Sequence, residues 1–137
     1  MLLLRNIECY DPNPCGKKDL LIAADKIEKI APAGTLSDNP LIDTQYDCSG
    51  LSAFPGIIDQ HVHILGAGGE QGFESRTKEL DVSDLQSAGV TTVVGLLGAD
   101  GTTRTLENLY AKAKALKAQN VTAYLYSGSY AVPPVTF

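Results

Sequence analysis

The sequence pattern changes at the stretch FPGIIDQHVHILGAGGEQG, residues 54–72. It holds the chain's 2 histidines, one residue apart, between an apolar run and a glycine-rich segment. We predict a buried strand over residues 56–65. Because side chains alternate across a strand, Asp59, His61 and His63 would share one face, with the histidine Cα atoms about 7 Å apart.

The sequence after residue 53 alternates between strand and helix patterns. DVSDLQSAG predicts a short helix that begins after Asp81 and ends at Gly89, and VTTVVGLLG predicts a buried strand. TRTLENLYAKAKALKAQN has apolar residues at helical spacing, and VTAYLYSGSY predicts another strand. This βαβαβ order predicts an α/β unit with a parallel sheet.

Residues 1–53 predict a separate, small antiparallel β domain. LLLRNIECY and LIDTQYDCSG are strand patterns, DPNPCGKKD is dense in turn-forming residues, and LLIAADKIEKIAP predicts two strands around residues 24–26. The 3 cysteines lack metal-site spacing. We expect Cys9 and Cys48 to pack as small apolar groups and Cys15 to be exposed.

Charge and hydropathy exclude some classes of partner. The net charge is −5, and no basic run suggests nucleic acid binding. No signal peptide and no apolar run long enough to span a membrane is present, so we expect a cytoplasmic protein without a membrane partner.

Metal binding is the preferred interpretation of His61 and His63. The carboxyl ends of parallel strands are where such sheets build their sites, and two imidazoles on one face can converge on one ion. The alternative is a pair of histidines satisfied by hydrogen bonds in a core. Asp59 would support the site or pair with a buried polar group. A catalytic zinc site usually takes three protein ligands, so two histidines are an incomplete site.

The loop GAGGEQG allows two interpretations. Glycines after a strand can cradle a phosphate group through backbone N–H groups. Glu70 in the middle of the loop would repel an anion, and no GK[ST] follows. Glu70 therefore suits a cationic group of a substrate, or it is a solvated loop acid.

Several motifs together resemble a known family. FPGIIDQHVH resembles the first barrel strand of the amidohydrolase superfamily. DQHVHILGAGGEQG, AGVTTVVGLLGADG, RTLENLYAKAKAL and SGSYAVP resemble the isoaspartyl (β-aspartyl) dipeptidase family in the same order. The resemblance implies that residues 54–137 are the first βαβαβ part of a TIM-type (β/α)8 barrel. That barrel is incomplete in this chain, and a small β domain precedes it.

The resemblance also implies a function and site residues. A full-length protein would hydrolyse β-aspartyl dipeptides with two zinc ions and metal-activated hydroxide, as a homo-oligomer. His61 and His63 match metal ligands, Glu70 matches the residue that binds the substrate α-ammonium, and Tyr130 matches a substrate-binding residue that stabilises the oxyanion. Gly68 lies where the loop backbone would approach substrate.

Two departures leave alternatives open. Ala99 stands at a substrate-binding position where this family would have threonine, so the dipeptide preference is open. The later ligands and the catalytic aspartate are absent, so we expect the 137 residues alone to be inactive. The alternatives are a cyclic-amide amidohydrolase of the dihydroorotase or hydantoinase kind, and a non-catalytic assembly module.

Overall fold

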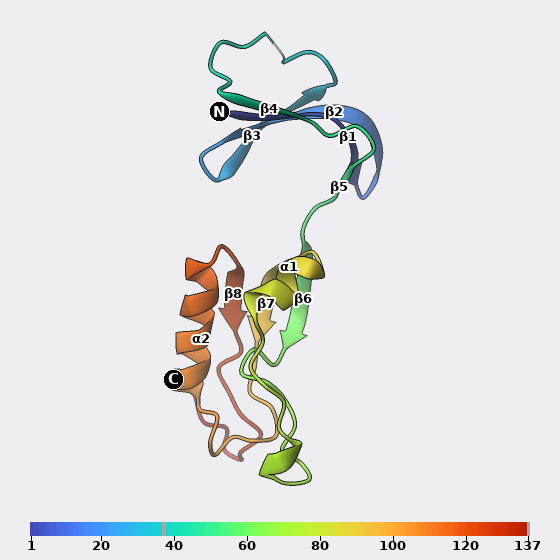
Figure 1. Ribbon diagram of the computed structural model, residues 1–137. Helices are drawn as coiled ribbons and strands as arrows, with labels where there is room; N and C mark the ends of the chain where they lie inside the picture. Colours follow the sequence, from blue (N-terminus) through green and yellow to red (C-terminus); the bar gives the residue numbers. More distant parts are fainter. Residues whose placement is uncertain (37, 137) are drawn as a thin grey trace. The chain divides into compact units, whose positions relative to one another are not determined.

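The computed structural model describes residues 1–36 and 38–136, which form two compact units. One unit is Met1–Pro55, and the other begins at Gly56. Figure 1 shows their elements, and each unit is described by itself below. No helix among the described residues has the length and the apolar character needed to cross a bilayer.

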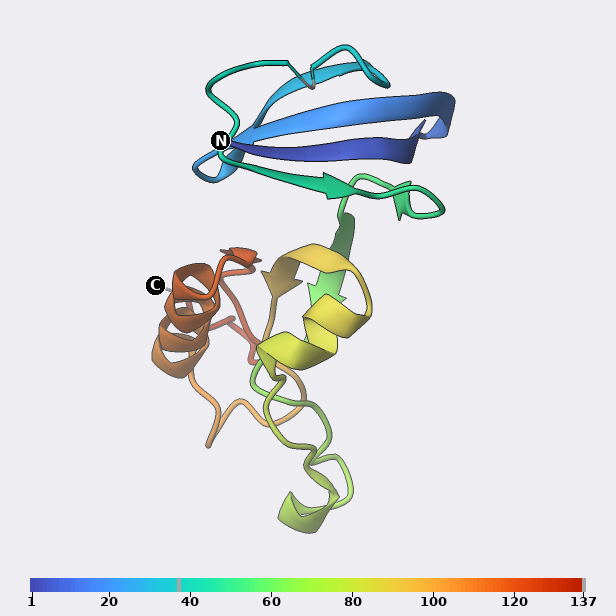
Figure 2. The same cartoon turned by 45° about the horizontal axis from the view of Figure 1, so that its top comes forward.

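The first unit is a five-stranded sheet built around a long N-terminal strand, β1 (Leu2–Asp11). β1 pairs antiparallel with β2 (Asn13–Ala23), and β2 pairs antiparallel with β3 (Lys26–Pro32). The opposite edge of β1 pairs in parallel with β4 (Thr44–Asp47) and then with β5 (Ser52–Ala53) (Figure 2). The expectation of an antiparallel unit is therefore only partly right.

The turn predicted over DPNPCGKKD is also much shorter than expected. β1 runs to Asp11 and β2 starts at Asn13, so only Pro12 separates the strands, and residues 13–18 pair with β1. Turn-forming residues are tolerated here because the β1–β2 register is irregular and Gly16 adopts a φ of 73°.

The core of the first unit is small and contains one buried carboxylate. Ile7, Cys9, Leu20 and Cys48 form its cluster, while Cys15 is exposed, as the sequence predicts for the three cysteines. Burial raises the pKa of the Cys9 thiol. Asp19 is fully buried and accepts hydrogen bonds from the backbone N–H groups of Asn6 (3.2 Å) and Gly34 (2.8 Å).

The second unit is a three-stranded parallel sheet, in the order β6 (Ile57–Val62), β7 (Val90–Gly95) and β8 (Thr122–Leu125). The predicted parallel arrangement is confirmed. Helix α1 (Val82–Ser87) leads into β7, and α2 (Leu106–Ala118) leads into β8. A short 3-10 helix, η1 (Phe73–Ser75), lies in the loop after β6.

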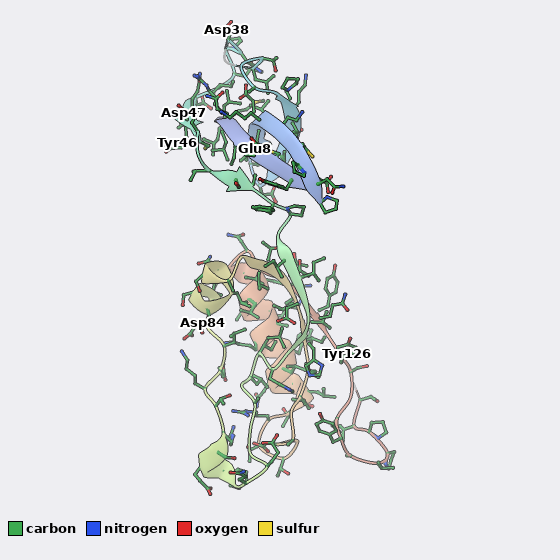
Figure 3. The ribbon with its side chains drawn as sticks, turned by 90° about the vertical axis from the view of Figure 1, so that its right-hand side faces the viewer. Glu8, Asp38, Tyr46, Asp47, Asp84 and Tyr126 are labelled. Atoms are coloured by element: carbon green, nitrogen blue, oxygen red, sulfur yellow. The ribbon has the colours of Figure 1, made fainter. Side chains whose placement is uncertain are left out.

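α1 begins and ends where the sequence predicts, and α2 lies within the predicted helical stretch 103–120. Asp81 and Asp84 form a capping box at α1, and Gly89 follows its end with a φ of 70°. Figure 3 shows Asp84 on this short helix. α2 begins after Thr105, whose hydroxyl accepts from the Asn108 N–H, and Asn120 follows its end in the left-handed region, with a φ of 64°.

The core of the second unit joins both helices to the sheet. Leu85 from α1, the buried side of α2 and Val93 from β7 belong to one cluster; the α2 residues are Leu106, Leu109, Ala113 and Leu116. In contrast, β6 is largely exposed, with Ile57 and Ile58 at 54% and 61%. The expectation that β6 is buried is wrong for this chain, because β6 is an edge strand that pairs only with β7 among the described residues.

Candidate functional site

The histidine pair lies at the carboxyl end of β6. His61 is an exposed residue of the strand, and His63 is half-buried and follows the strand's last residue. Their ring centroids are 5.3 Å apart and the rings meet edge to face, at 86°. The two imidazoles therefore lie side by side.

His63 has a buried nitrogen without a hydrogen-bond partner. Its Nδ1 is enclosed, and no donor or acceptor of the described structure pairs with it. The ring lies close to Gly98, where an added Cβ would come within 3.4 Å of that nitrogen. An imidazole with a buried, unpaired Nδ1 differs from the satisfied core histidine of the alternative interpretation.

Asp59 acts on the backbone. Its carboxylate is exposed and accepts a hydrogen bond from the His61 N–H at 3.1 Å. The β6–β7 register is irregular between Asp59 and Val62, the stretch that contains His61. This contact supports the local strand conformation.

The histidines alone do not complete a metal site. Within the described ranges, no group of three or more His, Cys, Asp or Glu side chains is arranged to hold a metal ion. The two histidines would supply two of the three protein ligands that a catalytic zinc site usually takes.

A loop with hydrogen bonds within its own backbone follows His63 and contains Glu70. Its neck is closed by Ala67 and Thr77, where the Thr77 N–H donates to the Ala67 carbonyl oxygen (2.9 Å) and the Ala67 N–H donates to Thr77 Oγ1 (2.8 Å). Glu70 is an exposed residue of a turn closed by the Gly72 N–H on the Gly69 carbonyl oxygen (3.2 Å). Figure 1 shows this loop leaving the arrowhead end of β6.

Gly68 is required by the loop itself. Its φ is 79°, and an added Cβ would lie 2.3 Å from the Ser75 carbonyl oxygen. A side chain at this position is excluded on both counts. The family resemblance implies a role for Gly68 in the approach of substrate, whereas the contact in the structure is with the loop's own backbone.

Sequence reasoning missed the residues that hold this loop. Arg104 is buried, at 6% exposed, and donates to the carbonyl oxygens of Ala67 (2.9 Å) and Thr77 (2.6 Å). Asp100 is also buried and pairs with Arg76 at 3.3 Å. Arg104 and Asp100 belong to the segment between β7 and α2, so they join two loops at the carboxyl end of the sheet.

Asp100 is held as a carboxylate by its own loop. Its Oδ1 accepts from the Thr102 and Thr103 N–H groups at 3.2 and 2.9 Å, and its Oδ2 accepts from the Thr103 hydroxyl. These bonds, led by the one from the Thr103 hydroxyl, lower the pKa of Asp100 below its usual value. An aspartate followed by glycine and two threonines is a turn signal that was available in the sequence, whereas nothing local indicates the partners of Arg104.

The remaining predicted site residues lie on other loops. Ala99 is exposed and precedes Asp100. Tyr130 follows β8, is 73% exposed, and lines a cavity of about 200 Å³ with five other residues, Leu96, Leu97, Tyr126, Gly128 and Ser129. Figure 3 shows Tyr126 on the segment after β8. The structure thus brings His61 and His63 into contact and places Glu70, Ala99 and Tyr130 on three loops that follow β6, β7 and β8.

The chain is similar in both fold and sequence to a solved structure. A beta-aspartyl dipeptidase from Fervidobacterium islandicum AW-1, crystallised in complex with beta-Asp-Leu dipeptide, is 49% identical over 99% of this chain, with a TM-score of 0.90. The resemblance to isoaspartyl dipeptidase is confirmed. This chain corresponds to 35% of that structure, and it is related to the amidohydrolase superfamily.

More distant relatives agree with this relationship. Imidazolonepropionase from Mycolicibacterium smegmatis is 31% identical over 92% of this chain and 32% of the relative. A dihydroorotase from Streptococcus pyogenes is 31% identical over 80% of this chain and 25% of the relative. The chain therefore spans only a quarter to about a third of the length of these proteins. No protein-family model matches it.

Proposed function

We propose that this chain contributes the first metal ligands and the ammonium-binding loop of a zinc-dependent hydrolase of β-aspartyl dipeptides. The observation that carries the proposal is the contact between His61 and His63 at the end of β6, directly ahead of the loop with Glu70. The 49% identity to a beta-aspartyl dipeptidase supports this choice of substrate. In this proposal residues 1–53 are a separate domain and residues 54–137 begin the barrel.

The chemistry divides between the metal and the chain. Zinc lowers the pKa of water to about 7 and so supplies hydroxide at neutral pH. His61 and His63 would hold it. Glu70 would bind the α-ammonium group of the substrate, because a charge-assisted hydrogen bond between a carboxylate and an ammonium is among the stronger ones. The Tyr130 hydroxyl would donate to the oxygen of the scissile carbonyl as negative charge develops there.

The reaction also needs a group that transfers a proton and a further zinc ligand, and residues other than these must supply them. Water adds across the isopeptide C–N bond, so one group must move a proton to the leaving amine. Catalytic zinc also needs at least a third protein ligand. We therefore expect the isolated 137-residue chain to be inactive, and detectable turnover of β-Asp-Leu by that chain would contradict this division of roles.

The experiment is a comparison of two substrates in the zinc-loaded protein that carries this sequence. One is β-Asp-Leu, and the other is succinyl-leucine, which is the same molecule without the α-amine. Glu70→Gln should lower kcat/KM for β-Asp-Leu about 10- to 100-fold, the value of a hydrogen bond to a charged group. It should leave succinyl-leucine unaffected. Glu74→Gln, in η1 of the same loop, is the matched control.

A cyclic-amide hydrolase is the second candidate, because the chain is also 31% identical to a dihydroorotase. Substrates of that kind carry no α-ammonium group for Glu70. Hydrolysis of dihydroorotate without hydrolysis of β-Asp-Leu would replace the first proposal with this one.

A further inference from the structure

The neck of the loop that carries Glu70 depends on one side chain from another loop. The Ala67 and Thr77 backbones face each other there, and each has a carbonyl oxygen that accepts from Arg104. Nη1 reaches Ala67 at 2.9 Å, and Nη2 reaches Thr77 at 2.6 Å. One guanidinium therefore bridges both sides of the neck.

The fit around this guanidinium is close. Arg104 is 6% exposed, and a Cβ added at Gly66 would come within 2.8 Å of its Nη2. Gly66 also has a φ of 84°. The planar fork of arginine can reach two carbonyl oxygens at once from a fixed orientation, which the ammonium of lysine, a point charge on a flexible stem, does not reproduce.

A second set of contacts between the two loops involves Gly69, the neighbour of Glu70. Arg76 Nε pairs with Asp100 Oδ2 at 3.3 Å, and a Cβ added at Gly69 would lie 3.4 Å from the Asp100 Cβ. Gly69 is the neighbour of Glu70 and opens its turn. The loop after β6 is thus held against the loop after β7 at its neck and again beside the turn.

We infer that Arg104 is a positioning residue for substrate binding, which fixes through the neck where Glu70 presents its carboxylate. The inference rests on the proposed function, since it assigns Arg104 to the same ammonium site. Loss of the bridge would let Glu70 sample other positions, and small misplacements of a binding group are costly. The effect should appear in KM for substrates that carry the α-ammonium group.

The test is a double-mutant cycle in the zinc-loaded protein that carries this sequence. Arg104→Ala should raise KM for β-Asp-Leu by roughly 10-fold or more, with kcat within about threefold of wild type. In the Glu70→Gln background the same substitution should have no further effect on KM. Arg104→Lys should also raise KM, because its ammonium does not bridge both carbonyls. Thr102→Ala, in the same segment, is the control.

Hydrogen exchange supplies a readout that needs no turnover. The amides of Thr77 and Gly69 are hydrogen-bonded within the loop and should exchange faster in Arg104→Ala, whereas the Val93 amide in β7 should not change. A general loss of stability would accelerate all three amides. Unchanged exchange at Thr77 would overturn the bridging role directly.

The outcomes separate this inference from the proposed function. If wild type does not hydrolyse β-Asp-Leu, the proposed function fails. If wild type hydrolyses it and Glu70→Gln raises KM, but Arg104→Ala leaves KM unchanged or acts equally in both backgrounds, the inference alone is wrong. Should Arg104→Ala fail to fold, Arg104→Lys decides: a wild-type KM in that variant would overturn the inference.

Discussion

The imidazole of His61 lies edge to face with that of His63, at a centroid separation of 5.3 Å. His61 is exposed and His63 has a buried nitrogen without a partner, so neither ring is satisfied as a core histidine would be. The proposed metal site at the carboxyl end of β6 rests on this relationship.

Replacing either histidine should therefore remove zinc without unfolding the protein. We expect His61→Ala to lower the zinc content measured by elemental analysis. The free energy of unfolding of the metal-free protein should stay within about 0.5 kcal/mol of the wild-type value, as for surface substitutions. Gln60→Ala, an exposed neighbour on β6, should leave zinc content unchanged. Full zinc occupancy in a His61→Ala/His63→Ala double variant would refute the assignment.

Gly68 offers a test of the loop's own requirements. Gly68→Ala should destabilise the protein, because its φ is 79° and the new Cβ would meet the Ser75 carbonyl oxygen. Gly128→Ala is the control, since nothing lies within 4 Å of its added Cβ. Chemical denaturation of both variants checks this. Equal stability of the two would mean that the loop relaxes freely around residue 68.

Asp19 should be among the most sensitive positions of the first unit. Asp19→Ala would leave the N–H groups of Asn6 and Gly34 without their acceptor in a buried site, at a cost of about 1–3 kcal/mol for an unsatisfied group. Asp19→Asn keeps one side-chain oxygen and should lose less. Urea denaturation followed by circular dichroism gives the comparison, and an Asp19→Ala variant as stable as wild type would contradict this reading of the buried contact.

Low pH should weaken the contribution of Asp100 to the stability of the folded protein. Its pKa is lowered in the folded state, chiefly by the Thr103 hydroxyl, so it stabilises the fold above the unfolded value near 3.8 and loses this effect as pH falls through the lower folded value. The stability difference between wild type and Asp100→Asn should accordingly be full at pH 7 and narrow below about pH 4. If the stability difference between the two proteins grew as the pH fell, the pKa of Asp100 would be raised and not lowered in the folded state.

Features set by local sequence were predicted well. Asp81 and Gly89 bound α1 because a cap and a left-handed glycine act over a few residues, whereas the cap of α2 at Thr105 was not predicted. The histidine contact was predictable because strand alternation is equally local.

Features set by distant residues were missed. The first part of β2 has the composition of a turn, but most of it pairs with β1, because the partner strand decides its conformation. The exposure of Ile57 depends on which strands flank β6. Arg104 meets Ala67 across 37 positions of sequence, and no pattern within the GTTRT segment indicates such a partner.

The exposed isoleucines of β6 have a practical consequence for handling this polypeptide. An unpaired edge strand with exposed apolar side chains is a template on which strands of further copies can pair. Natural proteins usually protect such edges with lysine or proline. Expression of these residues by themselves would favour inclusion bodies, and a charged substitution at Ile58 is the first remedy to try.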